Sequence, residues 1–396
     1  MDKVKSKSII IYGLGEDGRK SYNYLAQRFN IIGCSDTDQN KKNSELAQMA
    51  GYIEPSALLQ YEFDYILITS NGYGTVILQY LTETIKVERQ KILLPEEWDR
   101  LLFKADYGNK NVDKTFYVMT KEIRFKNGLL SLVFAVLEQL DYVDKNGWIP
   151  IVDLQSYKNQ YLESDKIGKE NAWEYYFEQL SSYTLQEVYN SKNVILGYDD
   201  PCYLENYGKR YSTDRMSELY NKYIHIKTDL LKKVEDEKNR YLGQSKNVLG
   251  VLYRGTDVNA LKLAHYPIQP DLHELIAEIK EKYKDWNCDK IFLSTEDEYA
   301  TLEFKKEFGD NIVYTDQPRY SDTGKQWISD IKKDRKNDRY LRGEEYLTTI
   351  YILTKCNHFI SGISNGSIMT IIMNDHCYQH VNMIDKGSYA IEHEKM

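Results

Sequence analysis

The chain lacks the features that accompany secretion, disulfide scaffolds and membrane insertion. Its five cysteines are scattered, odd in number and without a C-x-x-C pair, which is typical of free thiols in a reducing compartment. No window approaches the ~18 uninterrupted apolar residues of a membrane helix. The N-terminus has no apolar segment followed by a cleavage site. We therefore expect a cytoplasmic protein without a transmembrane segment, for which only peripheral membrane contact stays open.

An excess of positive charge is also missing. The 396 residues carry 52 Lys and Arg against 60 Asp and Glu, so the formal net charge is −8. This balance argues against nucleic acid or an anionic membrane as a partner, although a local basic pocket can exist in an acidic protein. The 35 tyrosines and the many Lys, Asn and Ile residues favour a bacterial source with an AT-rich genome.

Alternating strand and helix patterns predict an α/β protein of three domains, because the chain is too long for one ordinary core. A Rossmann-like N-terminal domain is expected at 1–105, a second α/β domain at 115–243, and a third, doubly wound domain at 244–396. The polar stretch 104–114 is the predicted linker. The strands predicted for the first two domains span 8–12, 30–34, 65–69, 115–120, 148–154 and 194–197.

The third domain has the clearest alternation. Its predicted strands span 248–253, 290–294, 312–315 and 358–361, and its predicted helices span 270–283, 299–308, 344–355 and 367–373. A single long helix is expected over 215–241, just before this domain. The charged, weakly apolar stretch 316–342 is interpreted as a loop over the ligand site.

A glycine turn follows the first strand of the chain. Gly13, Gly15 and Gly18 form G-x-G-x-x-G before a helical pattern, and Asp36 follows eighteen residues after Gly18. This spacing suits a nucleotide whose ribose meets an acid. The alternative is that the glycines only allow tight packing of strand and helix. Asp36 and Asp38 also mimic a metal-binding D-x-D, but their position favours ribose contact or simple turn chemistry.

The third domain has polar turns after three of its strands. Arg254 and Asp257 follow the first strand, 294–297 follows the second with the sequence Ser-Thr-Glu-Asp, and 361–367 follows the last with Ser-Gly-Ile-Ser-Asn-Gly-Ser. Ligands of open α/β sheets bind at the carboxyl ends of strands. A guanidinium and a helix N-terminus both suit a pyrophosphate. For Ser367 alone, N-capping is the simpler interpretation.

These three turns resemble the donor half of the superfamily of α1,6-fucosyltransferases, nodulation fucosyltransferases and protein O-fucosyltransferases. The stretch 124–154, a glycine turn before a long helix and a strand, is similar to the first βαβ unit of their acceptor half. The resemblance covers about 115–390 and implies a GT-B-like pair of Rossmann-like domains, with the acceptor side at 115–243 and the donor side at 244–396.

The resemblance also implies roles for individual residues. Arg254 would hold the donor pyrophosphate and Asp257 would orient its turn. Asp297 would lie near the nucleoside, and Ser364 and Ser367 near the phosphates. The implied donor-binding set is completed by Asn127, Gly128, Ser294 and Asn365.

The chain departs from this family in two positions of the arginine turn. Relatives commonly have histidine two residues before the arginine and a second basic residue after it, whereas this chain has Leu252 and Gly255. The missing charge is expected from a loop residue. The candidates are Lys262, Arg319 and Arg342.

The implied reaction is metal-independent, inverting transfer of a sugar, with GDP-fucose as the expected donor and no cofactor. The acceptor would be a glycan, a lipid-linked sugar or a protein of a surface polysaccharide pathway. Asp153 and Glu163 are candidates for the general base. The aromatic stretch 173–177 favours core packing over sugar stacking. His376, Cys377 and His380 have zinc-ligand types, but a predicted strand would separate them.

Two other function classes stay open. A nicotinamide-dependent sugar oxidoreductase would use the glycine turn, but it needs a Tyr-x-x-x-Lys pair, which Tyr207 and Lys209 do not supply. A nucleotide-sugar sensor or scaffold would bind the donor without turning it over. The oligomeric state is open.

Overall fold

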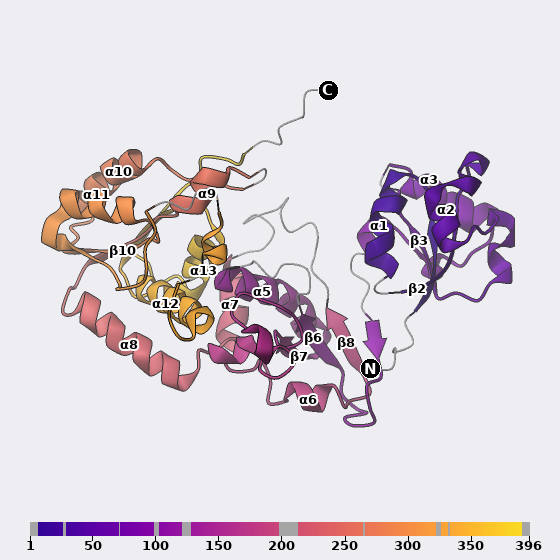
Figure 1. The fold of residues 1–396 in the computed structure, drawn as a ribbon, viewed down its shortest axis with the longest axis horizontal. Helices are drawn as coiled ribbons and strands as arrows, with labels where there is room; N and C mark the ends of the chain where they lie inside the picture. Colours follow the sequence, from indigo (N-terminus) through magenta and orange to yellow (C-terminus); the bar gives the residue numbers. More distant parts are fainter. Residues whose placement is uncertain are drawn as a thin grey trace. The chain divides into compact units, whose positions relative to one another are not determined.

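The computed structural model describes residues 7–26, 29–70, 72–98, 103–120, 128–197, 213–263, 266–321, 326–331 and 333–389. Within these ranges no helix is long and apolar enough to cross a membrane. The chain forms two compact units (Figure 1). Unit 1 comprises Met1–Val118 and Gln186–Pro201, and unit 2 comprises Met119–Leu185 and Cys202–Met396.

Unit 1 contains a parallel sheet in the order β2-β1-β3-β4. Its strands are β1 Ser8–Tyr12, β2 Asn30–Ser35, β3 Tyr65–Ile68 and β4 Ile92–Leu93. Alternate residues of β1 point to opposite faces, so Ile9 and Ile11 join one core and Ile10 and Tyr12 the other. Burial on both faces is why these strands read as continuous apolar runs. The helices of this unit are α1 Glu16–Ala26, α2 Glu45–Ala50, α3 Gly74–Gln79 and α4 Pro95–Trp98.

A second sheet has the order β5-β8-β6-β7. Its strands are β5 Phe103–Ala105, β6 Phe116–Thr120, β7 Ile149–Asp153 and β8 Val194–Gly197, and β5 pairs with β8 antiparallel. The helix α5 Leu129–Asn146 leads into β7 and ends at Gly147, whose φ of 64° is the left-handed conformation that glycine adopts most easily. The short helix α6 Leu185–Val188 precedes β8.

The third sheet belongs to unit 2 and is parallel throughout, in the order β11-β10-β9-β12-β13. Its strands are β9 Val248–Leu252, β10 Lys290–Ser294, β11 Ile312–Val313, β12 His358–Gly362 and β13 His380–Ile384. Counted along the chain this is the order 3-2-1-4-5 of a doubly wound sheet. The α/β class and the Rossmann-like character predicted from the sequence are confirmed.

Helices cover both faces of this sheet (Figure 1). On one face α10 Leu272–Asp285 and α11 Glu298–Phe308 pack on β9 and β10 around Leu249, Val251 and Phe304. On the other face Gly250 lets α12 Asp338–Leu353 approach closely, because a Cβ at 250 would lie 3.1 Å from Leu353 Cδ2. The short helix α9 Thr256–Leu261 follows β9 directly.

Two helices differ from their predicted bounds. The helix predicted over 215–241 is two helices, α7 Thr213–Tyr223 and α8 Thr228–Leu242, because an isolated bridge between Phe177 and Ile226 interrupts it. The helix α12 begins at Asp338, six residues before the predicted start, so part of the predicted loop is helical. The last helix, α13 Asn365–Asn374, contacts both α5 and α7.

Candidate functional site

The candidate site lies where the order of the parallel sheet in unit 2 reverses. The first strand in sequence, β9, pairs with β10 on one side and with β12 on the other. The connections that leave β9 and β12 therefore diverge at their carboxyl ends, where doubly wound sheets bind ligands. The turns that carry Arg254 and Ser364 are these two connections.

The Arg254 turn is held by carboxylates. The guanidinium lies 3.2 Å from Asp257 Oδ1 and 3.5 Å from Glu296 Oε1. Asp257 is almost fully buried, and its other oxygen accepts the Ile328 amide at 3.2 Å. Asp257 thus contacts Arg254 and also joins the loop around Ile328 to the same turn.

Glu296 is a site residue that sequence reasoning missed. It follows β10, beside Ser294 and Asp297, and it accepts a hydrogen bond from Thr256 Oγ1 at 3.3 Å. Burial raises the pKa of Glu296, Arg254 lowers it, and Asp257 raises it further. The signal available in the sequence was an acid at the carboxyl end of the strand beside β9.

The space beside Gly255 is occupied by Asp297. A Cβ at 255 would lie 2.1 Å from Asp297 Oδ2, so a side chain at this position requires Asp297 to move. Asp297 is itself fixed, because its carboxylate caps α11 at the Ala300 amide. A side chain at position 255 therefore does not fit this turn unless Asp297 shifts.

Serines at the start of α13 cap the helix. Ser364 Oγ accepts the Ser367 amide at 3.0 Å, and Ser367 Oγ accepts the Ser364 amide at 2.8 Å, which is a reciprocal capping box. The N-cap is therefore Ser364, and Ser367, the third residue of the helix, takes part in the capping box without being the N-cap itself. Asn365 Nδ2 donates to Ser131 Oγ at 2.7 Å, which joins the start of α13 to the first turn of α5.

Two tyrosines line the region between these turns. Tyr346 lies against Gly366, where a Cβ would come within 2.4 Å of its hydroxyl. Burial raises the pKa of Tyr346 to about 12, and the charges of Arg254 and Glu296 both act on it. Tyr161, whose pKa is raised by burial, accepts a hydrogen bond from the Leu129 amide of α5. Both tyrosines are neutral hydroxyl groups near neutral pH.

Gly128 is the N-cap of α5 and has no side-chain capping partner. Ser294 is buried at the end of β10, and its carbonyl accepts the Tyr253 amide at 3.0 Å. As the N-cap of α5, Gly128 lies near Ser131, which contacts the start of α13. Asn127 lies outside the described residues.

A strap, residues 326–331, is fixed to the Arg254 turn. The Ile328 amide bonds Asp257, and Arg342 donates from its guanidinium to the carbonyls of Ile328, Ser329 and Ile331. The Arg342 guanidinium therefore already bonds carbonyl groups of the strap. The Arg319 guanidinium likewise donates to the carbonyls of Thr315 and Gln317.

The two candidates for the general base have other partners. Asp153 is fully buried, and its carboxylate accepts the Gln155 and Ser156 amides at 2.8 and 3.0 Å and the Ser156 hydroxyl at 2.7 Å. These contacts favour a turn-forming role for Asp153. Glu163 is half exposed and pairs with Arg339 Nε at 3.2 Å.

The aromatic stretch lies in the core of unit 2. Trp173, Tyr176 and Phe177 are buried, and Tyr176 stacks on Tyr340 of α12 at 5.7 Å between ring centroids. A Cβ at Gly343 would lie 2.3 Å from the Tyr176 ring, so the glycine admits the tyrosine. The core-packing interpretation is the one that these contacts support.

The glycine turn of unit 1 is closed by its own residues. Gly13 has φ 110°, and a Cβ at Gly18 would lie 2.1 Å from the Gly13 carbonyl oxygen. The buried Asp36 carboxylate accepts the Leu14 and Asp38 amides at 2.7 and 2.8 Å and pairs with Lys41 at 3.1 Å. This geometry favours the packing interpretation over a ribose contact, because the carboxylate is already bonded to the turn.

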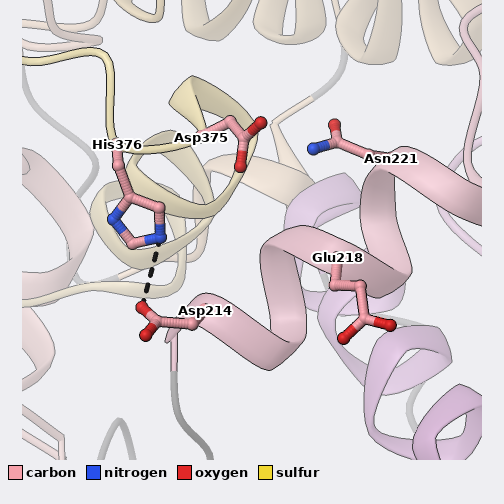
Figure 2. A pocket seen from close by; sticks show the side chains of 5 residues that line it. All are labelled: Asp214, Glu218, Asn221, Asp375 and His376. Atoms are coloured by element: carbon pink, nitrogen blue, oxygen red, sulfur yellow. Dashed lines mark ion pairs between the residues drawn. The ribbon is translucent and has the colours of Figure 1, made fainter.

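A pocket lies at the opposite end of α13 from Asn365 (Figure 2). His376 Nε2 pairs with Asp214 at 3.2 Å across it. His380 instead contacts His358. His376 and His380, two residues of types that can bind zinc, therefore have separate partners. With three carboxylates in its wall, the pocket does not suit a pyrophosphate. It is lined by Asp214, Glu218, Asn221, Asp375 and His376.

Comparison with known proteins finds one family model for the N-terminal part of the chain and several similar solved structures. A family model described as C2185-like, N-terminal, matches residues 5–93. No curated protein matches the chain. Solved structures similar to it include a NodZ α-1,6-fucosyltransferase soaked with GDP-fucose, at 13% identity and a TM-score of 0.41, over 62% of this chain and 87% of that chain.

Two further similar structures were solved with nucleotides. A mutant of Arabidopsis thaliana FUT1 in complex with GDP has 8% identity and a TM-score of 0.37, over 68% of this chain and 70% of that chain. POFUT1 in complex with GDP-fucose has 10% identity and a TM-score of 0.32, over 97% of this chain and 99% of that chain.

Proposed function

We propose that this chain is a metal-independent, inverting glycosyltransferase that transfers fucose from GDP-fucose. The observation that carries the proposal is the placement of Arg254 and the α13 N-terminus on the two connections that diverge between β9 and β12. A cation and a helix N-terminus at the carboxyl ends of neighbouring strands form a site for a pyrophosphate. The similar structures with GDP or GDP-fucose agree with this choice of donor.

In this proposal Arg254 supplies the positive charge that stabilises the departing nucleoside diphosphate. As the bond between the sugar and the β-phosphate breaks, negative charge grows on the phosphate, and a guanidinium already oriented by Asp257 stabilises it without reorganisation. The first-turn amides of α13 add the positive end of a helix dipole. Asp297, which caps α11 beside Gly255, would contact the nucleoside.

The segments 115–243 and 244–396 would act as the acceptor and donor sides of a GT-B-like pair. The α5 helix of the first segment contacts α13 of the second, so Ser131 and Asn365 meet beside the proposed donor phosphates. The acceptor would bind on the α5 side. We place the reaction in the cytoplasm, on glycan, lipid-linked or protein acceptors of bacterial surface polysaccharide synthesis.

A thermal-shift panel of nucleotide sugars, with and without magnesium, tests the donor. We expect GDP-fucose to raise the melting temperature of the whole chain equally in both conditions, since ligand bound only to the native state stabilises it. Arg254→Ala should lose the shift. Arg240→Ala, on the exposed face of α8, is the matched control and should keep it. Equal shifts by Arg254→Ala and the unaltered chain would refute the proposed site.

A further inference from the structure

Arg254 is already neutralised in the site that is meant to bind an anion. Asp257 contacts it from the first turn of α9 and Glu296 from the turn after β10. The Asp257 side chain is 4% exposed and the Glu296 side chain 15%. One guanidinium between two carboxylates leaves an excess of negative charge where the pyrophosphate must bind. One of the carboxylates must therefore release Arg254 when the donor arrives.

Glu296 is better suited than Asp257 to release the guanidinium. Its contact with Arg254 is the longer, at 3.5 against 3.2 Å. Asp257 also holds the Ile328 amide, whereas Glu296 accepts from the hydroxyl of Thr256, which can rotate. Burial already raises the pKa of Glu296. The charged and titratable groups around Glu296 are Arg254, Asp257, Asp297, Tyr253 and Tyr346.

On the basis of the proposed donor site, we propose that Glu296 is a positioning residue that holds Arg254 in the empty site and yields it to the donor pyrophosphate by taking up a proton. The proton comes from water and converts the Glu296 carboxylate to the neutral acid. The guanidinium then pairs with the phosphate oxygens, and Asp257 keeps it oriented.

This exchange links donor binding to pH. Binding removes the favourable charge of Arg254 from Glu296 and adds negative phosphate charge nearby, and both changes raise the pKa of Glu296. Donor binding is therefore accompanied by proton uptake, and donor affinity falls as pH rises above the pKa of Glu296 in the empty site. The limiting slope is about tenfold per pH unit for one proton.

Isothermal titration of the full chain with GDP-fucose, in two buffers of different ionisation enthalpy, measures this proton directly. Each phosphate of GDP-fucose carries one ester and one anhydride bond and only a strongly acidic oxygen, so the phosphates do not titrate near neutral pH. We expect net proton uptake by the unaltered chain. Glu296→Gln should bind without uptake, with an affinity that no longer falls with pH. Glu298→Gln, at an exposed position on the same turn, should behave as the unaltered chain.

Each outcome separates this role from the donor assignment. GDP-fucose binding by the unaltered chain without proton uptake at any pH from 5 to 8 would leave the donor assignment intact and overturn the role of Glu296. Uptake that persists in Glu296→Gln would do the same. If the unaltered chain does not bind GDP-fucose at all, the proposed function fails, and the role of Glu296 fails with it.

Discussion

Both units place a turn after the first strand of a parallel sheet, but the two turns satisfy their polar groups differently. In unit 1 the Asp36 carboxylate bonds two backbone amides of the turn region and Lys41. In unit 2 the carboxylates of Asp257 and Glu296 bond a side-chain cation, Arg254. A carboxylate bonded to backbone amides stabilises the turn, whereas a guanidinium held by side chains can be transferred to a ligand. A strand, turn and helix therefore do not by themselves define a binding site.

The largest expected effect is a difference in transfer rate between substitutions of Arg254 and Lys41, the cations beside the two turns. Arg254→Ala should lower the rate of fucose transfer about 10²–10³-fold, the typical cost of removing one preorganised group that stabilises transition-state charge. Lys41→Ala, beside Asp36, should leave the rate unchanged. A radiolabelled GDP-fucose transfer assay measures both. Equal losses in the two variants would contradict the difference between the units.

Gly18→Ala should destabilise unit 1 without affecting transfer. Its Cβ would lie 2.1 Å from the Gly13 carbonyl oxygen, so the turn or α1 must shift, at a cost of about 1–3 kcal/mol. Gly72→Ala, where a Cβ meets nothing within 4 Å, is the control. Peptide-resolved hydrogen exchange reports the stability of unit 1. Unchanged exchange in Gly18→Ala would show that the close approach is not maintained in solution.

Asp36→Asn should have a smaller effect on the same unit. An amide oxygen can accept from one backbone amide, but the amide nitrogen cannot accept from the other, so we expect a loss of about 1 kcal/mol. Denaturant unfolding measures the change. If Asp36→Asn instead abolishes a nucleotide-induced thermal shift assigned to unit 1, the carboxylate contacts a ligand and the packing interpretation is wrong.

Acidification should affect unit 2 and spare unit 1, because all seven histidines lie in unit 2. Burial, and then the charge of His380, lower the pKa of His358. The unfolded chain therefore binds more protons, so stability from this group is present above the unfolded pKa of about 6.5 and is lost as pH falls below it. Hydrogen exchange at pH 7 and 5 should show faster opening in unit 2. His358→Asn should reduce that pH dependence.

The sequence predicted most strands to within a residue or two, because buried parallel strands are continuous apolar runs between polar turns. It also predicted that Arg254 and Asp257 act together, since they are three residues apart. Glu296 and Ile328 could not be paired with them, because their contacts depend on how a distant turn and a strap fold back. The sequence could not decide between the alternatives for Asp153 and Asp36 for a related reason: a carboxylate at a strand end looks the same in sequence whether it bonds backbone amides or faces a ligand.

The close approach of Gly255 to Asp297 has a kinetic consequence. Because a side chain at position 255 would meet Asp297, that position adds no cation beside Arg254, and the site presents the Asp257 and Glu296 carboxylates to an arriving nucleotide sugar at neutral pH. Like charges slow diffusional encounter, and added salt screens that repulsion within about 8–10 Å. GDP-fucose should therefore associate faster as ionic strength rises, the reverse of the behaviour of a basic phosphate-binding cleft.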